Sequence, residues 1–182
     1  GQIYDPFVYL GVLSTVTKEI ALGVASVILP LRHPAHVSKA AASVDALSAG
    51  RLLLGVASGD RPEEYPLMNL DFDNRGQRFQ DSVNYIRAMG TAYPQAELPH
   101  GYLSGGADML PKPVSSRLPL IITGGSQQSS EWVAKNGDGW MTYPRNATVQ
   151  GRLVTDYRGR IERLGITNKP VMQSLYIDLQ PQ

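Results

Sequence analysis

The sequence predicts an α/β protein built around a parallel sheet. Helix-like and strand-like segments alternate strictly, and the strand-like segments are apolar at both alternate positions, as strands covered on both faces are. This alternation is typical of a doubly wound sheet or of a (β/α)8 TIM barrel. The G-x-G-x-x-G motif of dinucleotide-binding folds is absent. Glycine or serine also recurs at the carboxyl ends of strands, where barrels carry their active sites, and the barrel explains this recurrence.

The first predicted helix covers residues 5–17. Asp5 is a suitable N-cap, and Pro6 stands at the first helical position, where proline is well tolerated. Apolar residues then recur at helical spacing. The short, β-branched and apolar segment 20–29 predicts the first strand, which Pro30 ends.

The alternation continues through the next 60 residues. A second helix is expected within 33–51, where apolar residues share one face and Gly50 serves as the C-cap. Residues 51–58 predict another buried strand, and 59–65 predict a loop. Within 75–92, apolar residues are spaced by three and four positions, which predicts a third helix.

Residues 93–118 interrupt this alternation, because they are rich in proline and glycine and show little periodicity. We expect an irregular insertion, which is either a functional lid or disordered, as long structureless stretches usually are. Beyond it, strands are expected at 119–123, 139–143 and 171–178, and helices at 127–136 and 147–164. Five helices and five strands result, in a single domain over 1–182.

Composition excludes several classes of function. With 17 basic and 16 acidic residues the net charge is +1, and no basic cluster is long enough to follow a nucleic-acid backbone. The absence of cysteine excludes disulfides, thiol nucleophiles and thiolate metal sites, and it fits a cytoplasmic location. The longest apolar stretch, 24–31, is too short to span a membrane. We therefore expect neither a nucleic-acid partner nor a membrane anchor.

The segment "IITGGSQQSSEW" predicts an anion site where a strand passes into a helix. Gly124 and Gly125 allow the backbone to approach a ligand closely, and Ser126 stands where an N-cap belongs. The free amides of the first helical turn would bind the anion, with the hydroxyls of Ser126, Ser129 and Ser130 as further donors. An ordinary strand-to-helix junction with a serine cap is the alternative interpretation.

Other polar residues have both a functional and a structural interpretation. His33 and His36 stand at a helix start, and capping or packing is the default because a third metal ligand is not evident. We expect no metal site. Asp60, Tyr143 and Arg145 follow the carboxyl ends of predicted strands and are weak candidates for catalytic contacts with a substrate.

Several longer segments carry a family resemblance. They are "LGVASVILPLRHPAHVSKAAASVDALSAGRLLLGVASGDRPEEY", "DFDNRGQRF", "ITGGSQQSSEW" and "DGWMTYPR", and they stand in family order from about Ile3 to Arg145. The chain resembles the luciferase-like flavin monooxygenases of the bacterial luciferase superfamily, which are (β/α)8 barrels. Within that superfamily it is similar to an uncharacterised subgroup of luciferase-type oxidoreductases.

The resemblance implies roles for particular residues. It places a non-prolyl cis peptide at Ala25–Ser26, beneath the isoalloxazine ring of the flavin. It matches Ser58 and Gly59 to positions that contact the flavin and its phosphate, although bacterial luciferase has an arginine where Ser58 stands. The phosphate-binding stretch of the family matches Gly125, Ser126 and Ser129, beside Gly124 of the anion site described above.

The resemblance also implies an activity. We expect a monooxygenase that uses reduced FMN and O2 on a small organic substrate, with a flavin reductase as a possible partner and homodimers as the common assembly. A deazaflavin-dependent oxidoreductase that transfers hydride, and a non-catalytic flavin-binding subunit, are the alternatives. Nothing in the sequence names the substrate.

The chain departs from the family in the number of strands. A complete barrel has eight strands, and the sequence predicts about five βα units. By the resemblance, the first two strands would precede Gly1 and the last would follow Gln182. The catalytic histidine of the family lies on the second strand, so the candidate base would also precede Gly1. We therefore expect an incomplete barrel that is a fragment of a longer chain, whose activity on its own the sequence leaves open. Assembly with a partner is the alternative.

Overall fold

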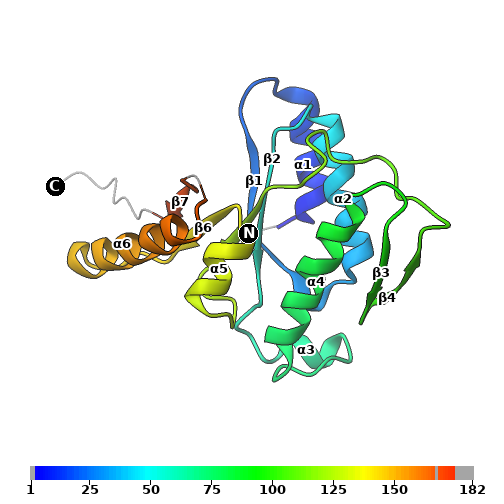
Figure 1. Cartoon of the computed structure of the whole chain (residues 1–182). Coiled ribbons are helices and arrows are strands. Elements are labelled where there is room, and N and C mark those ends of the chain that lie inside the picture. The colour runs from blue at the N-terminus through cyan, green and yellow to red at the C-terminus, as the bar shows by residue number, and fades with distance from the viewer. Residues whose placement is uncertain (1–2, 167, 175–182) are drawn as a thin grey trace.

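A computed structural model describes residues 3–166 and 168–174 (Figure 1). Within that part of the chain the helices are α1 (Pro6–Val16), α2 (Pro34–Leu47), α3 (Glu64–Leu67), α4 (Arg75–Met89), α5 (Ser130–Asn136) and α6 (Ala147–Arg163). The strands are β1 (Leu22–Ile28), β2 (Leu52–Ala57), β3 (Gln95–Leu98), β4 (Gly101–Ser104), β5 (Leu120–Thr123), β6 (Gly139–Thr142) and β7 (Val171–Gln173). No helix of this part is long and apolar enough to cross a bilayer.

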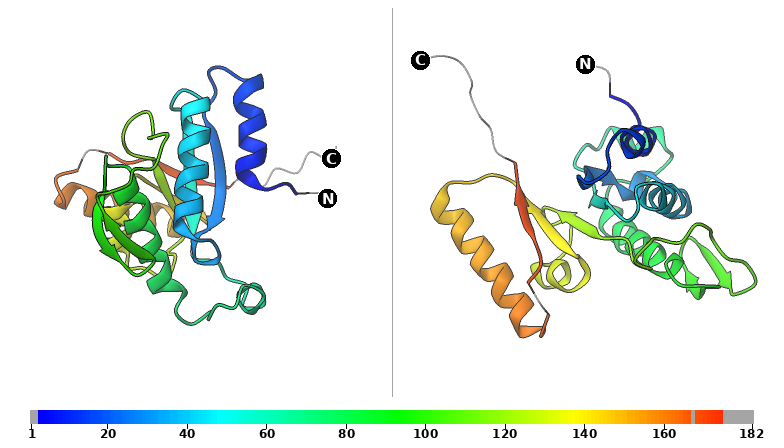
Figure 2. Two further views of the ribbon diagram at one scale, coloured as in Figure 1. Left: turned by 90° about the vertical axis from the view of Figure 1, so that its right-hand side faces the viewer. Right: turned by 90° about the horizontal axis from the view of Figure 1, so that it is seen from above.

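The main sheet has five strands in the order β1-β2-β5-β6-β7, and every neighbouring pair is parallel. Helices α1, α2, α4, α5 and α6 lie on one side of this sheet, as the view from above shows (Figure 2). The parallel α/β architecture predicted from the sequence is confirmed, as is the partial barrel. Of the expected strand 171–178, residues 171–173 form β7, and those from 175 onward lie outside the described residues.

The core lies between the helices and the sheet. Alternate residues of β2, Leu52, Leu54 and Val56, are fully buried against the helices, and Leu120 and Ile122 of β5 continue the same layer. Strand residues two apart share a face, so this alternation directs one face of each strand into the core. Because all five strands run parallel, their carboxyl ends lie at the same edge of the sheet.

The first two strands approach each other unusually closely at Gly55. A Cβ atom at this position would lie 2.1 Å from the carbonyl oxygen of Val24. The β1–β2 register shifts between Val24 and Val27, beside this contact. Only glycine fits here, because any side chain would collide with the backbone of β1.

The proline-rich segment 93–118 is irregular only in its second part, residues 105–118. It contains the antiparallel hairpin β3–β4, which packs beside α4 at the edge of the molecule (Figure 1). The paired residues 95–98 and 101–104 are all exposed or half-buried, so the hairpin lacks the buried apolar alternation that marks a strand in a sequence. Short exposed strands of this kind are held mainly by backbone pairing.

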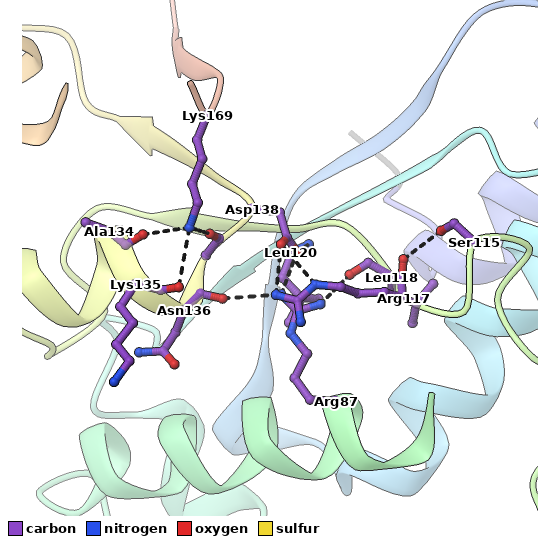
Figure 3. Close-up of polar contacts among 11 residues, drawn as sticks. Arg87, Ser115, Arg117, Leu118, Leu120, Ala134, Lys135, Asn136, Asp138 and Lys169 are labelled. Atoms are coloured by element: carbon purple, nitrogen blue, oxygen red, sulfur yellow. Dashed lines mark hydrogen bonds and ion pairs between the residues drawn. The ribbon is translucent and has the colours of Figure 1, made fainter. Parts of the chain in front are cut away.

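A network of ion pairs ties the amino ends of β5 and β6 to α4 (Figure 3). One carboxylate oxygen of Asp138 accepts from Arg87 at 2.5 Å and from the Leu120 amide at 2.9 Å, and the other accepts from Arg117 at 3.0 Å. Burial alone would raise the pKa of Asp138, but the Leu120 amide and the two guanidinium groups hold it below its usual value. The network fixes the junction between α5 and β6.

Two further cations close the amino-terminal side of the sheet. Lys169 donates to the carbonyl oxygens of Ala134 and Gly137, both at 2.6 Å, at the end of α5 (Figure 3). Burial lowers the pKa of Lys169, although Asp138 favours its charged form. Arg51 donates to the carbonyl oxygens of Ile20 at 2.8 Å and Ser48 at 2.7 Å, which joins the turns before β1 and β2.

Candidate functional site

A groove of about 550 Å³ opens at the carboxyl ends of β1, β2 and β5. Its volume lies in the range of small-molecule sites, roughly 300–1,000 Å³. Its wall residues are mostly small. They come from the ends of β1, β2 and β5 and the turns that follow, with Glu64 from α3 and Tyr143 from the end of β6. The residues that line it are Ala25, Ser26, Ile28, Ala57, Ser58, Gly59, Asp60, Arg61, Glu64, Thr123, Gly124, Gly125, Ser126, Gln127 and Tyr143. None belongs to the segment 93–118.

The first wall is formed by the ends of β1 and β2. The Ala25–Ser26 peptide bond is cis, and this prediction is confirmed. Ser58 is 4% exposed, and Gly59 beside it has a φ of +78°. A Cβ atom on Gly59 would lie 2.8 Å from Ile28 Cγ2, so glycine is needed both for the backbone angle and for the close packing.

Tyr65 of α3 holds this wall in place. Its hydroxyl donates to the carbonyl oxygen of Ser58, and its side chain is fully buried. Burial raises the pKa of Tyr65 above its usual value. The Phe72 ring packs edge-on against the Tyr65 ring, with 5.1 Å between the ring centroids. The guanidinium carbon of Arg75 lies 3.6 Å from the centroid of Phe72.

The second wall is the turn after β5, which begins at Gly124. Its amide donates to the Met141 carbonyl at 2.7 Å, and its carbonyl accepts from the Trp140 indole at 2.9 Å. Gly124, Ser126 and Gln127 have φ values of +58°, +47° and +61°. Left-handed residues in a turn can direct successive amides toward one point, which is the geometry of many anion sites.

The helix cap in this segment differs from the sequence prediction. Ser129, rather than Ser126, is the N-cap of α5, and its Oγ accepts from the Trp132 amide at 3.1 Å. Ser126 is instead in the left-handed region and donates its hydroxyl to the Thr123 carbonyl at 2.8 Å. The reason is that Ser126 and Gln127 adopt turn conformations, which delay the helix to Ser130. Ser129 keeps its own hydroxyl proton available for another acceptor.

The structure places some of the predicted contact residues in the groove and others outside it. Asp60 and Tyr143 line the groove and are exposed. Arg145 does not line it, because its guanidinium donates to Thr142 Oγ1 and to the Tyr143 carbonyl, both at 3.0 Å. Ser129 also lies outside the lining, one residue beyond the turn. Ala25, Ser26, Ser58, Gly59, Gly124, Gly125 and Ser126 all line one groove.

The histidines lie away from this groove. His33 caps α2, its Nδ1 accepting from the Ala35 amide at 3.2 Å, as the default interpretation expected. The His33 ring lies 6.0 Å from His36 and 5.7 Å from His100, which comes from the β3–β4 turn. Within the described residues, no group of three or more His, Cys, Asp or Glu side chains is arranged to hold a metal ion.

Comparison with known proteins identifies the family. The model of the luciferase-like monooxygenase family matches residues 1–177. The chain belongs to the luciferase-like monooxygenases. An uncharacterised Mycobacterium tuberculosis protein is 31% identical over 147 residues, which are 80% of this chain and 52% of that protein. The chain thus spans about half the length of the curated relatives it matches.

Two solved structures share the fold. The oxygenating constituent of 3,6-diketocamphane monooxygenase from Pseudomonas putida, in complex with FMN, superposes with a TM-score of 0.76 at 18% identity. That match covers 92% of this chain and 51% of the other. An F420-dependent secondary alcohol dehydrogenase, in complex with an F420–acetone adduct, gives 0.78 at 17% identity and covers 94% and 54%. At these identities the likeness concerns the fold alone.

This luciferase-like chain also uses residues that the sequence did not single out. Thr123 lines the groove, and its buried hydroxyl has no hydrogen-bond partner within residues 3–166 and 168–174. Tyr65 and Gln128 hold the two walls from outside. Gln128 contacts Gly76, 52 residues away, and Tyr65 contacts Ser58 across the loop after β2. No helical or strand periodicity predicts either contact. An exception is Thr123, whose place at a strand end was a usable signal.

Proposed function

We propose that this chain forms the flavin-binding part of a luciferase-like oxidoreductase, which uses reduced FMN and O2 to oxidise a small organic substrate. The observation that carries the proposal is the single groove that joins the ends of β1 and β2 to the turn after β5. Residues matched to flavin contacts by family likeness, although far apart in the sequence, line this one space. Family membership supports the same class of chemistry.

The residues present fit a planar cofactor with a phosphate. Ala25, Ser26 and Ala57 have small side chains, which leave room for a flat ring system against the first wall. The buried hydroxyl of Thr123 lacks a partner and would donate to a ligand in the groove. In water-excluded sites such unpaired groups are costly, so a ligand oxygen or nitrogen would satisfy it.

The phosphate would be held by the second wall. We assign it to the backbone of Gly125 and Ser126 and to the Ser126 hydroxyl. The family match adds the hydroxyl of Ser129, which lies just outside the groove lining. Arg61 is the cation that lines the groove, but its side chain is 75% exposed and lies 3.4 Å from Glu64. The phosphate would therefore be bound mainly by neutral donors, which suits a preorganised turn better than a flexible side chain.

When bound, reduced FMN supplies the electrons for the reaction with O2. The chain contributes orientation and exclusion of water. The buried Ser58 and the glycine backbone of the first wall would fix the ring plane, and Asp60 and Tyr143, at the rim, would meet the substrate. We also propose that the whole protein forms a homodimer, as is common in the family, and that a flavin reductase supplies its reduced FMN.

The proposal is tested by titrating the intact protein with FMN, riboflavin and a deazaflavin coenzyme while following fluorescence. We expect saturable FMN binding that is tighter than riboflavin binding, because the second wall recognises the phosphate. Mixing the reduced complex with O2 in a stopped-flow spectrometer should then give flavin oxidation that depends on an added organic substrate.

Other outcomes assign a different function. Preferential binding of the deazaflavin, with hydride transfer and no need for O2, would make the protein a deazaflavin-dependent oxidoreductase. Tight FMN binding without any substrate-dependent oxidation would indicate a non-catalytic flavin-binding subunit. If none of these cofactors bound, the groove would have no flavin function.

A further inference from the structure

The turn after β5 is held in an unfavourable backbone conformation. Ser126 and Gln127 both have positive φ values, +47° and +61°, although neither is a glycine. Side chains in the left-handed region crowd the following carbonyl, so two such residues in succession persist only when the surroundings enforce them. The contacts that enforce them lie on α4.

Gln128 makes most of those contacts. Its Nε2 donates to the Gly76 carbonyl at 2.8 Å and to the Ser126 carbonyl at 3.1 Å. Its Oε1 accepts from Gln80 Nε2 at 2.6 Å. One amide side chain thereby ties the turn to two successive turns of α4, and it satisfies a carbonyl inside the turn itself.

Gly76 allows this close approach. A Cβ atom at Gly76 would lie 2.9 Å from Gln127 Cβ, closer than real Cβ atoms come. The helix backbone therefore rests directly on the turn. The same end of α4 also reaches the first wall, because Arg75 stacks on Phe72, which packs against Tyr65.

From these contacts we infer that Gln128 and Gln80 are positioning residues for phosphate recognition. They hold the backbone of Ser126 and Gln127 in the conformation that leaves its amides free to bind a ligand in the groove. Their contacts with the start of α4 stabilise that unfavourable conformation. The inference rests on the proposed flavin function and deepens it. It names the residues that give the second wall its shape, none of which would touch the reacting part of the cofactor.

The test compares three methionine variants of the intact protein. Gln128→Met and Gln80→Met keep the length of the side chain and remove its amide. Gln77→Met is the matched control, because Gln77 lies on the same helix and donates to Asp81 at 2.9 Å on the exposed side. The affinities of FMN and riboflavin, which differ by the phosphate, are measured for each.

We expect Gln128→Met to weaken FMN binding on the order of tenfold, since several hydrogen bonds are lost, and riboflavin binding by less than about twofold. Gln80→Met should weaken FMN about threefold, and Gln80→Lys should recover most of this because an ammonium group still donates to Gln128 Oε1. Gln77→Met should change neither affinity. A general loss of folding would instead affect both ligands alike.

A second readout needs no cofactor. The amides of Gly124 and Gln128 donate to the carbonyls of Met141 at 2.7 Å and Gly125 at 2.8 Å, so their protection from hydrogen exchange reports opening of the turn. Their protection should fall in Gln128→Met, because local opening becomes easier, and should be unchanged in Gln77→Met. If the unchanged protein binds FMN and Gln128→Met leaves both the FMN-to-riboflavin ratio and the exchange rates as they were, the positioning role is wrong while the proposed function stands. If the unchanged protein binds no flavin, the proposed function fails, and the role in phosphate recognition fails with it.

Discussion

The two ends of the parallel sheet are built in opposite ways. At the amino end, Asp138 is held by two arginines and a backbone amide, and Arg51 and Lys169 close the neighbouring turns. At the carboxyl end, the groove is lined mostly by glycines, alanines and serines, although Asp60, Arg61 and Glu64 also belong to the lining. The Thr123 hydroxyl is buried there without a hydrogen-bond partner among the described residues. In barrels the carboxyl end carries activity and the amino end carries stability. The contrast predicts that substitutions at the two ends will separate these properties.

The largest expected effect is on stability, from Asp138→Ala. Arg87 would be left as an uncompensated cation in a largely buried place, which costs roughly 3 kcal/mol or more in the free energy of unfolding. Denaturant unfolding measures it, and FMN affinity of the folded variant should not change. Asp156→Ala is the control, because its pair with Arg160 at 2.8 Å is exposed and should matter little. A variant that lost affinity but not stability would contradict the separation.

Gly55→Ala should affect both properties, because Gly55 lies between the two ends. Its new methyl group would collide with the Val24 carbonyl and push the end of β1 outward, at a cost of about 2 kcal/mol. We expect a lower melting temperature together with weaker FMN binding. Gly23→Ala offers a matched comparison, since a Cβ there meets its nearest atom at an ordinary 3.6 Å. Equal stability of the two alanine variants would argue against the close approach of β1 and β2.

Ser126→Ala should act on the groove alone. The hydroxyl now donates to Thr123, and in the proposed complex it would turn to a phosphate oxygen. Its loss should weaken FMN binding by about 1 kcal/mol, roughly fivefold, and should leave riboflavin binding nearly unchanged. Calorimetric titration with both ligands measures the difference. Unchanged FMN affinity would return this segment to an ordinary strand-to-helix junction.

The smallest effect concerns the β3–β4 hairpin, which belongs to neither end. Burial lowers the pKa of His100 below its usual 6.5, Arg78 and His33 lower it further, and Asp81 opposes them. An undocked hairpin would therefore bind a proton more readily than a docked one, so docking is strongest above pH 6.5 and weakens as the pH falls. The protection factors of residues 95–104, which are exchange rates corrected for the intrinsic effect of pH, should fall between pH 7 and 5. His100→Gln should abolish that dependence, and its persistence would assign the pH dependence to another group.

The elements that the sequence located best are those with strong periodicity and clear caps. Asp5 caps α1 by accepting from the Phe7 amide at 3.0 Å, and α4 ends within three residues of its expected limit. The β3–β4 hairpin could not be predicted from the sequence, because its residues are not buried in an alternating pattern. The cap of α5 was misplaced by three residues, since a serine-rich segment offers several suitable caps and local preference does not choose among them.

The sequence by itself determined the parallel α/β architecture and the strand ends that carry the groove, because burial periodicity and glycine positions are local properties of the chain. The family came from the resemblance of whole segments, not from periodicity. Only the tertiary structure decided which residues support that groove. Gln128 and Gly76 are 52 residues apart and meet through a single hydrogen bond, and Gly55 is required because of a carbonyl on a different strand. Such contacts depend on how α4 and β1 are packed, and no periodicity within either segment records them.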